Sequence, residues 1–441
     1  MSGPQKRAVR WWKDFDDPNL NALIQQALDS NFSLRTVWDR LAQAEAIARK
    51  EGAALYPSVN LNAGASRSRT QTGDIATYAS HFRLEAAAGY ELDLWGRVRS
   101  QREAALLDVQ AGELEVQAAA ISLSASVAST WYRLAEALAQ ARVLASQKKT
   151  NEQLLNLVTL RFQQGQVQAV DVLQQRQLVQ SSEGLLAIAE QRTEALRHQL
   201  AVLLGKPPKA ELNPSDPLLI QPGPLPRTGI PAEWMQRRPD MRAAYLAVQA
   251  QDRRLASAIA ARYPRLSLTA GLETSGTKTR FLFDNWLANL AANVAQPLFE
   301  GGRLQAEVDR NRAALSQAYH EYGQTLLNAL QEVEDALSRE VHQESYLQSL
   351  EKQLSTAAVV IERTRSSYLN GQLDYLRVLE ALTSRQSLER ERLAAQRERI
   401  EYRIQLHRAL AGSLVLARPA PSALPVNDSG EIGNTEAALD E

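Results

Sequence analysis

The sequence has no cysteine in its 441 residues, which excludes disulfide bonds, thiolate metal sites and cysteine nucleophiles. It has no net charge, because 50 Lys and Arg balance 50 Asp and Glu. Nucleic-acid binders carry a basic excess, so nucleic acid is not expected as a partner. No run of about 18 apolar residues occurs, and therefore no helix is predicted to span a bilayer. With three methionines, the chain also offers no thioether path for Cu(I) or Ag(I).

Aromatic residues make up only 6% of the chain, whereas Ala, Leu, Gln, Glu and Arg recur throughout. This composition is typical of long helices. The basic residues within the first seven positions are not followed by an apolar segment, so no signal peptide is predicted there.

The chain repeats itself at an offset of about 206 residues. Tyr56-Pro57 recurs as Tyr263-Pro264 (264 − 57 = 207), and Gly165 recurs as Gly371 (371 − 165 = 206). Further markers, around Gly96-Arg97 and Gly205, recur in the same order. Because one offset relates all of them, we expect two structural repeats.

A proline-rich stretch separates the repeats, with nine of the 17 prolines lying between residues 206 and 239. Proline at this density excludes a regular helix or a central strand. We therefore divide the chain into an N-terminal extended segment (1–33), repeat one (34–205), an extended connector (206–239), repeat two (240–412) and a flexible, acidic tail (413–441).

Each repeat is predicted to contain a helix, two strands, a very long helix and a returning helix. In repeat one, we expect strands at about 58–68 and 78–92, the long helix at 98–163 and the returning helix at 170–204. In repeat two, the same elements are expected at 265–274, 286–296, 303–369 and 375–410. Because the returning helix is about half as long as its neighbour, it should stack end to end with the first helix of its repeat.

The long helices carry a coiled-coil seam. Apolar positions alternate at spacings of four and three, from Leu107 through Ala111 to Ala135 in the first long helix and from Leu315 through Tyr319 to Ala336 in the second. This pattern is typical of coiled coils, and its alanines allow close approach of the helix axes. From the helices alone, a soluble coiled-coil scaffold is an equally good interpretation.

The strands favour a membrane protein. Apolar residues alternate with polar ones in each strand, at a length of about ten residues that fits a tilted transmembrane strand. Three aromatic residues, Tyr78, Tyr90 and Trp286, lie near strand ends, where the interfacial girdles of membrane barrels belong. Polar loops at 67–77 and 274–285 join the strands of each hairpin and are plausible as external loops. The alternative is two hairpins that pack on helices in a soluble protein.

A membrane location would require several copies of the chain. Four strands cannot close on themselves, and an open sheet edge is not viable in lipid. Two chains would supply eight strands and three chains twelve, and only the larger ring leaves room for a water-filled bore.

Several motifs resemble those of the TolC-like outer-membrane factors of tripartite efflux pumps. They are Leu92-Asp93-Leu94-Trp95-Gly96-Arg97, Gln296-Pro297-Leu298-Phe299-Glu300-Gly301-Gly302-Arg303, and Arg161-Phe162-Gln163-Gln164-Gly165 with Asp171-Val172-Leu173. The segment from Trp11 to Leu20 resembles the lipoprotein branch of this family. The resemblance extends from about residue 10 to residue 412.

This resemblance implies a mainly α fold with transmembrane β-strands, in which three chains form a 12-stranded barrel in the outer membrane. A coiled-coil helical barrel would continue it into the periplasm. The implied function is passive export of drugs and detergents, with a periplasmic adaptor and an inner-membrane pump, commonly of the RND class, as partners. The lipoprotein branch carries an acylated N-terminal cysteine, and this sequence has none. A duct for type I protein secretion is the alternative.

The closed end of such a duct would lie where the helices turn back, at Gly165 and Gly371. We expect the residues that follow to ring the narrow end, and we single out Asp374, which three-fold symmetry would turn into a ring of like charges that favours cations. The same prediction assigns a latching role to three further residues, Asp171, Tyr368 and Arg377, and places Tyr375 among the residues of the gate. An isolated Asp374–Arg377 surface pair is the simpler alternative.

Catalysis has little support in the sequence. The five histidines are scattered and form no HExxH or i,i+4 pair, and no GxxxxGK[ST] phosphate loop occurs. We therefore predict a protein that is not an enzyme and that uses neither a cofactor nor a metal.

Overall fold

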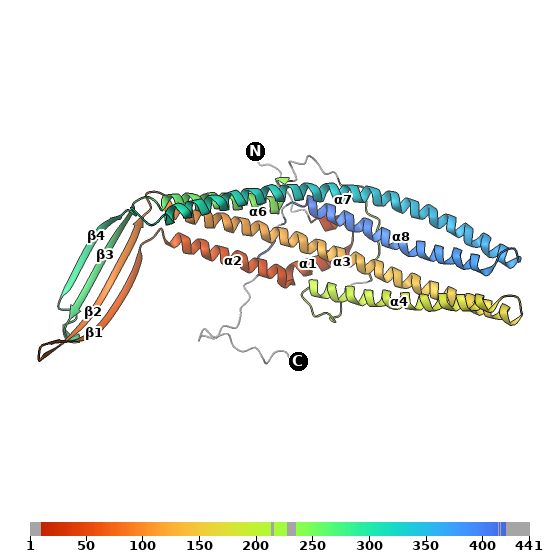
Figure 1. The fold of residues 1–441 in the computed structure, drawn as a ribbon, viewed down its shortest axis with the longest axis horizontal. Coiled ribbons are helices and arrows are strands. Elements are labelled where there is room, and N and C mark those ends of the chain that lie inside the picture. The colour runs from red at the N-terminus through yellow and green to blue at the C-terminus, as the bar shows by residue number, and fades with distance from the viewer. Residues whose placement is uncertain (1–9, 213–215, 227–234, 413, 415, 420–441) are drawn as a thin grey trace.

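The computed structural model describes residues 10–212, 216–226, 235–412, 414 and 416–419. The chain is elongated, with a four-stranded sheet at one end. At the other end lie the two turns that join α3 to α4 and α7 to α8 (Figure 1). No helix within these residues is both long and apolar enough to cross a bilayer.

The predicted order of elements is confirmed in both repeats. Repeat one contains α2 (Phe32–Ala53), β1 (Ser58–Thr72), β2 (Ile75–Leu92), α3 (Arg97–Gln163) and α4 (Ala169–Leu203). Repeat two contains α6 (Pro239–Ala260), β3 (Arg265–Gly276), the short η2 (Thr279–Phe281), β4 (Trp286–Ala295), α7 (Arg303–Leu369) and α8 (Tyr375–Leu410). At 67 residues each, α3 and α7 are about 100 Å long.

The long helix α3 begins where the sequence motif around Gly96 predicts it. Gly96 adopts a φ of 74°, which favours glycine, and turns the chain from β2 into the helix. The Asp93 carboxylate then accepts hydrogen bonds from the backbone N–H groups of Val98 (2.9 Å) and Arg99 (2.8 Å). These bonds satisfy two of the free donors at the helix start.

All four strands pair antiparallel in the order β1-β2-β3-β4. The loop predicted at 67–77 is wrong, because β1 and β2 continue to a two-residue turn at Gly73-Asp74, with Thr72 opposite Ile75. Polar residues occupy both faces of this extension, so no apolar alternation marks it as strand. The loop expected at 274–285 is largely confirmed, since β3 ends at Gly276 and only η2 interrupts the segment.

The predicted extended segment 1–33 is also wrong over its described part. It forms a 3₁₀ helix, η1 (Trp11–Phe15), and the helix α1 (Pro18–Ser30). The helix-start signal is present in the sequence: the Asp17 side chain accepts from Leu20 N at 3.0 Å, and Pro18 occupies the first helical position.

The largest core joins both repeats at mid-length. Aromatic residues of η1 (Trp11, Trp12, Phe15) pack with Trp131 and Tyr132 of α3, together with parts of α1, α4 and α8. Trp131 is 1% exposed and donates to the Asp17 carboxylate at 2.7 Å. The seam of α3 is buried from Ala111 to Ala135 at most predicted positions, whereas Tyr319 of α7 is 65% exposed in the single chain.

The connector has no helix or strand at 206–212 and 216–226, but the extended prediction is wrong at 235–239, where Met235 is helical and Pro239 begins α6. Its backbone is held by Arg403 of α8, which donates to Gly223 O (2.8 Å) and Pro224 O (3.1 Å). Nearly all of the predicted flexible tail lies outside the described residues.

His407 of α8 provides a pH-dependent contact in the core. Its ring stacks on Trp11 with the centroids 5.8 Å apart and lies 3.8 Å from the Asp14 carboxylate. Burial lowers the pKa of His407, Asp14 opposes this shift, and Arg403, itself paired with Glu340, adds to it. The folded protein therefore holds His407 neutral below the pH at which the unfolded chain protonates it.

We expect the stability to fall as the pH drops below about 6.5, because the unfolded state then binds the additional proton. In His407→Phe, which preserves the ring stacking, this part of the pH dependence should be lost. Urea midpoints of both proteins at pH 7.5 and 5.5 test the prediction. An equal loss of stability in both would contradict it.

Candidate functional site

The turns that join α3 to α4 and α7 to α8, at the end of the molecule opposite the sheet, have the same backbone geometry. Gly165 (φ 69°) and Gly371 (φ 72°) follow α3 and α7 in the left-handed conformation. In each turn, the N–H group after the glycine bonds to a carbonyl of the last helical turn: Gln166 N to Arg161 O and Gln372 N to Ser367 O, both 2.9 Å. These are Schellman caps, so the predicted tip glycines have a defined conformational role.

The predicted acids sit at the starts of the returning helices. Asp374 caps α8, and its carboxylate accepts from Arg377 N at 3.2 Å. Asp171 lies in the first turn of α4 and accepts from Gln168 N at 3.0 Å. The Arg377 side chain pairs with Glu380 at 3.0 Å rather than with Asp374, and both members of the pair are exposed. Asp374 therefore has no cation partner among the described residues.

Tyr375 is the only predicted gate residue that is fully buried. Its hydroxyl donates to Gln175 Oε1 of α4 at 2.6 Å, and Gln175 Nε2 donates to Asn151 O of α3 at 2.7 Å. Burial raises the pKa of Tyr375, so the phenol keeps its proton and remains a donor. This chain of hydrogen bonds, called here the tip latch (Tyr375, Gln175 and Asn151), fastens α8 of repeat two to α3 and α4 of repeat one.

Tyr368 lies beside the tip latch. Its ring centroid is 5.5 Å from that of Tyr375, and the Arg161 guanidinium lies 5.0 Å from the Tyr368 centroid. The Tyr368 hydroxyl and Arg161 Nη1 are buried atoms without a hydrogen-bond partner among the described residues. They adjoin a cavity of about 520 Å³ between the tips that Asp171, Tyr368, Asp374 and Tyr375 also line. The structure thus brings these four predicted residues together.

Sequence reasoning missed a row of buried polar side chains between α3, α4 and α8. Asn151 donates to Ser182 Oγ (2.8 Å) and accepts from Gln386 Nε2 (2.9 Å), while Gln147 donates to Gln386 O (3.1 Å). Gln147 and Asn151 lie with Leu144 and Val158 on a buried row of α3, spaced by three, four and seven residues, that is out of register with the predicted seam. Buried amides in an otherwise apolar row fix helix register, and this signal could have identified them.

By register, the three predicted girdle residues lie at three levels of the sheet, because Trp286 pairs with Thr274 and Thr274 pairs with Leu84, midway along β2 between Tyr78 and Tyr90. Tyr90 lies near the helical end, whereas Tyr78 lies toward the β1–β2 turn. Tyr78 and Trp286 are 59% and 73% exposed. The twelve positions from Tyr78 to Tyr90 span roughly 40 Å along β2.

No group of three or more acidic or histidine side chains within the described residues could hold a metal ion. The tips contain acids that cap helices, together with amides and phenols. Such groups can hold two helix tips together by hydrogen bonds that form and break reversibly.

Comparison with known proteins gives consistent results. The family described as outer membrane efflux protein matches residues 23–206 and 230–412. The pyoverdine export outer membrane protein OpmQ of Pseudomonas aeruginosa is 29% identical over 418 residues, covering 91% of this chain and 87% of that protein. The cation efflux system protein CusC of Escherichia coli is 28% identical over 407 residues, covering 91% and 88%.

Among solved structures, the outer membrane protein VceC of Vibrio cholerae superposes with a TM-score of 0.85 at 25% identity. The match covers 92% of this chain and 99% of that chain.

Proposed function

We propose, on the premise that this chain belongs to the outer membrane efflux protein family, that three copies form the exit duct of a tripartite pump for small molecules. The chain is a bacterial outer membrane efflux channel with a helical extension into the periplasm, and its family is not enzymatic. Its TolC-like fold, with two family repeats, is the one predicted from the sequence motifs.

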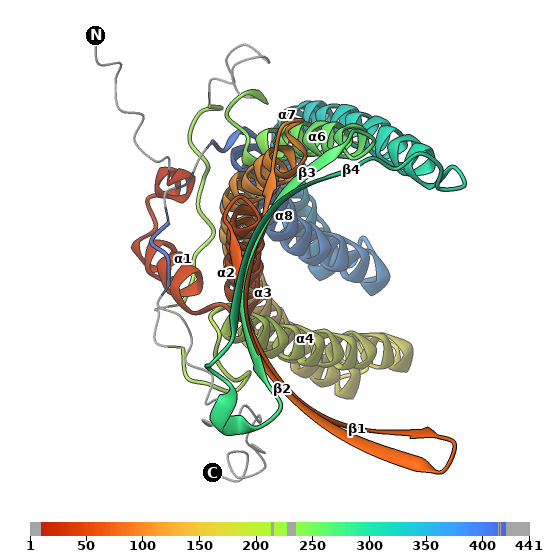
Figure 2. The ribbon, with the colours of Figure 1, turned by 90° about the vertical axis from the view of Figure 1, so that its left-hand side faces the viewer.

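The observation that carries the proposal is the incomplete sheet. The outer edges of β1 and β4 pair with no other strand in the described part of the chain, and both strands are exposed along their length. End-on, the sheet forms an open arc (Figure 2). Exposed apolar residues cover these strands, including Val59, Leu61, Leu290 and Val294, each more than 70% exposed. Unpaired edges and apolar faces of this kind require further strands and a lipid surround.

Three copies would close a sheet of twelve strands. The girdles formed by Tyr78 and Tyr90 support this arrangement, because a strand tilt of 35–45° reduces their separation to about 30 Å in height, close to the thickness of a hydrocarbon core. Light scattering during gel filtration in detergent should give a polypeptide mass of about 146 kDa, three times 48.8 kDa. A monodisperse monomer in detergent-free buffer would contradict the proposal.

At the periplasmic end, we assign Asp374, Tyr368, Asp171, Arg377 and Tyr375 to the gate. Three-fold symmetry places three copies of each around the axis. The Tyr368 hydroxyl and Arg161 Nη1 are buried in the single chain without a hydrogen-bond partner among the described residues, so they gain partners only when the tips rearrange in the closed duct. Asp374, without a cation partner, supplies the negative ring expected to favour cations.

Replacing Asp374 with asparagine separates charge from capping, because asparagine caps a helix as well as aspartate does. We expect Asp374→Asn to lower the cation-to-anion permeability ratio at least about twofold with unchanged trimer stability. Reversal potentials in a planar bilayer with a salt gradient measure this ratio. Asp309→Asn, far from the tips on α7, is the matched control. An unchanged ratio in Asp374→Asn would refute the ring.

The proposed partners are a periplasmic adaptor and an inner-membrane pump of the RND class. The names of the relatives, which describe pyoverdine export and cation efflux, favour small cargo over secreted proteins. Restored resistance of a duct-deficient bacterium to drugs or detergents, only when adaptor and pump are present, would test this assignment.

A further inference from the structure

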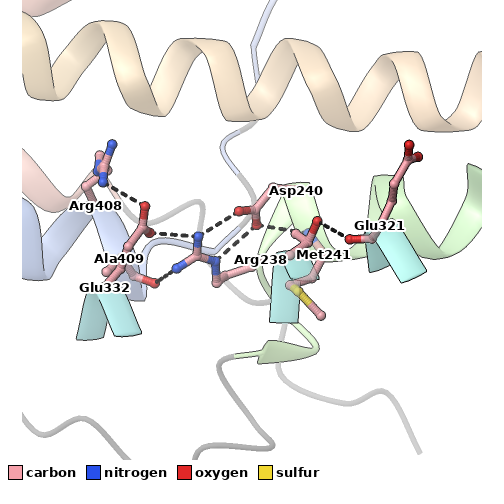
Figure 3. Close-up of polar contacts among 8 residues, drawn as sticks. Arg238, Asp240, Met241, Glu321, Glu332, Arg408 and Ala409 are labelled. Atoms are coloured by element: carbon pink, nitrogen blue, oxygen red, sulfur yellow. Dashed lines mark hydrogen bonds and ion pairs between the residues drawn. The ribbon is translucent and has the colours of Figure 1, made fainter. Parts of the chain in front are cut away.

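The C-terminal end of α8 meets the N-terminal end of α6 at a cluster of charged residues, called here the joint (Figure 3). Arg238, the residue before α6, is 7% exposed and donates to the last-turn carbonyl Ala409 O at 3.1 Å. Its guanidinium also pairs with Asp240 (2.6 Å) and with Glu332 of α7 (2.9 Å). Glu332 in turn binds Arg408 at 3.0 Å. One side chain therefore connects the ends of two stacked helices to the long helix beside them.

Repeat one has the same joint at the equivalent positions. Asn31, the residue before α2, donates to Leu203 O at the end of α4 at 2.9 Å. The offsets match the repeat, since 238 − 31 = 207 and 409 − 203 = 206. Ser30 adds a second bond, to Leu204 O at 2.7 Å. Both joints stack two helices end to end, as the sequence predicted. In both, the residue just before the first helix of the repeat, α2 or α6, supplies the side chain that holds the other helix.

The two joints differ in charge and in their attachment to the long helix. The position in α3 equivalent to Glu332 is Ser126 (332 − 206 = 126), which is exposed and, in the described part of the chain, donates to Ser122 O of its own helix. Repeat one therefore uses neutral bonds, and its long helix takes no part. In repeat two, Arg238 binds two carboxylates, and an ion pair fixes the joint to α7.

Packing around the joint of repeat two is uneven. Met241 of α6 and Leu406 of α8 join an apolar cluster with Val333 of α7, whereas the side that faces α3 is less filled. A cavity of about 230 Å³ separates Arg238, Asp240 and Glu332 from Ala118, Ile121 and Ser122 of α3. The joint is thus held by its ion pairs more than by apolar packing against repeat one. Burial opposes ionisation of Asp240, but Arg238 lowers its pKa, so this carboxylate stays charged at neutral pH.

From these contacts we infer that Arg238 is a positioning residue for the gate, which sets the angle of α8 against α7 and so places the α8 tip that carries Tyr375. The helix has 36 residues and is about 54 Å long, so a tilt of about 5° at the joint moves the tip by about 5 Å. A shift of that size exceeds the reach of the Tyr375–Gln175 hydrogen bond. This inference rests on the proposed function, because the tip must belong to a gate.

Spin labels at the tips test the inference, since the cysteine-free chain needs no background mutation. Leu376→Cys on α8 and Val170→Cys on α4 are repeat-equivalent (376 − 170 = 206), and both native side chains are exposed. In the full-length protein in detergent, we expect Arg238→Ala to shift the Leu376→Cys distances between copies by about 5 Å or more. The Val170→Cys distances should stay unchanged.

Two further variants separate positioning from general loosening. Glu332→Gln keeps the size of the side chain but removes its charge, and it should shift the α8 label in the same direction. Asn31→Ala should shift neither label, because Ser30 still holds α4. Unchanged α8 distances in both Arg238→Ala and Glu332→Gln, or equal shifts at both tips, would overturn the inference. A chain that gives no inter-copy distances at all would instead refute the proposed trimer.

Discussion

Replacing Glu340 with alanine should lower the free energy of unfolding by about 3–5 kcal/mol, because it leaves a buried guanidinium without its counter-charge. Glu340 of α7 is 3% exposed and Arg403 of α8 is 5% exposed. Arg403 Nε lies 2.9 and 3.0 Å from the two carboxylate oxygens, and its other nitrogens hold the connector at Gly223 and Pro224. Loss of Glu340 therefore disturbs α7, α8 and the connector together.

Urea unfolding followed by helical circular dichroism measures the effect.

Two control variants test whether the loss of stability comes from the unpaired buried charge. Glu307→Ala removes a partly exposed partner of the exposed Arg310 and should change the midpoint little. The double variant Glu340→Leu with Arg403→Met removes both charges and should recover much of the stability, because apolar replacement of a buried pair is often neutral. A Glu340→Ala midpoint equal to that of Glu307→Ala would contradict this account.

Replacing Tyr375 with phenylalanine should open the duct. The change removes one hydroxyl and leaves Gln175 Oε1, in a fully buried side chain, without its donor. An unsatisfied buried acceptor costs about 1–3 kcal/mol, and three copies that close together would multiply this to about 3–9 kcal/mol. We therefore expect the closed state to lose its advantage, with an increase of tenfold or more in open probability, since about 1.4 kcal/mol corresponds to a factor of ten.

Single-channel recording in a planar bilayer measures the open probability. Tyr346→Phe is the matched control, since it removes a tyrosine hydroxyl that bonds to Glu391 between α7 and α8 at an exposed position. It should leave the open probability unchanged. If both variants open the duct equally, the tip latch has no special role, and if neither does, other contacts close the gate.

Much of the fold could be predicted because local signals agree with the tertiary structure. The Tyr-Pro pairs, the tip glycines and the motif around Gly96 each have a direct backbone consequence, and their common offset identifies the repeat. The errors have equally local causes. The outer part of the β1–β2 hairpin is polar on both faces, so alternation could not reveal it. The helix α1 has capping signals at Asp17 and Pro18, which the prediction of an extended segment at 1–33 does not use.

The candidate site was only partly accessible from sequence. Tyr368, Asp171, Asp374 and Tyr375 could be placed near the tips because they follow or precede the turn glycines, and the structure brings them to one cavity. Their partners could not be predicted, since Gln175, Asn151 and Gln386 come from three helices whose relative register depends on packing. Asn31 and Arg238 share a repeat position but differ in chemistry, so only the structure reveals their common role.

The central claim is that three copies join their sheets edge to edge into one closed ring. Cysteine cross-linking tests it most directly, because this sequence has no cysteine. Val59→Cys on the free edge strand β1 would be combined with single cysteines along β4 (Trp286–Ala295), and the protein oxidised in detergent. The account predicts, at the matching register, a covalent ladder that stops at the trimer, about 146 kDa. A ladder that ends at the dimer, continues beyond the trimer, or never forms at any register would contradict it.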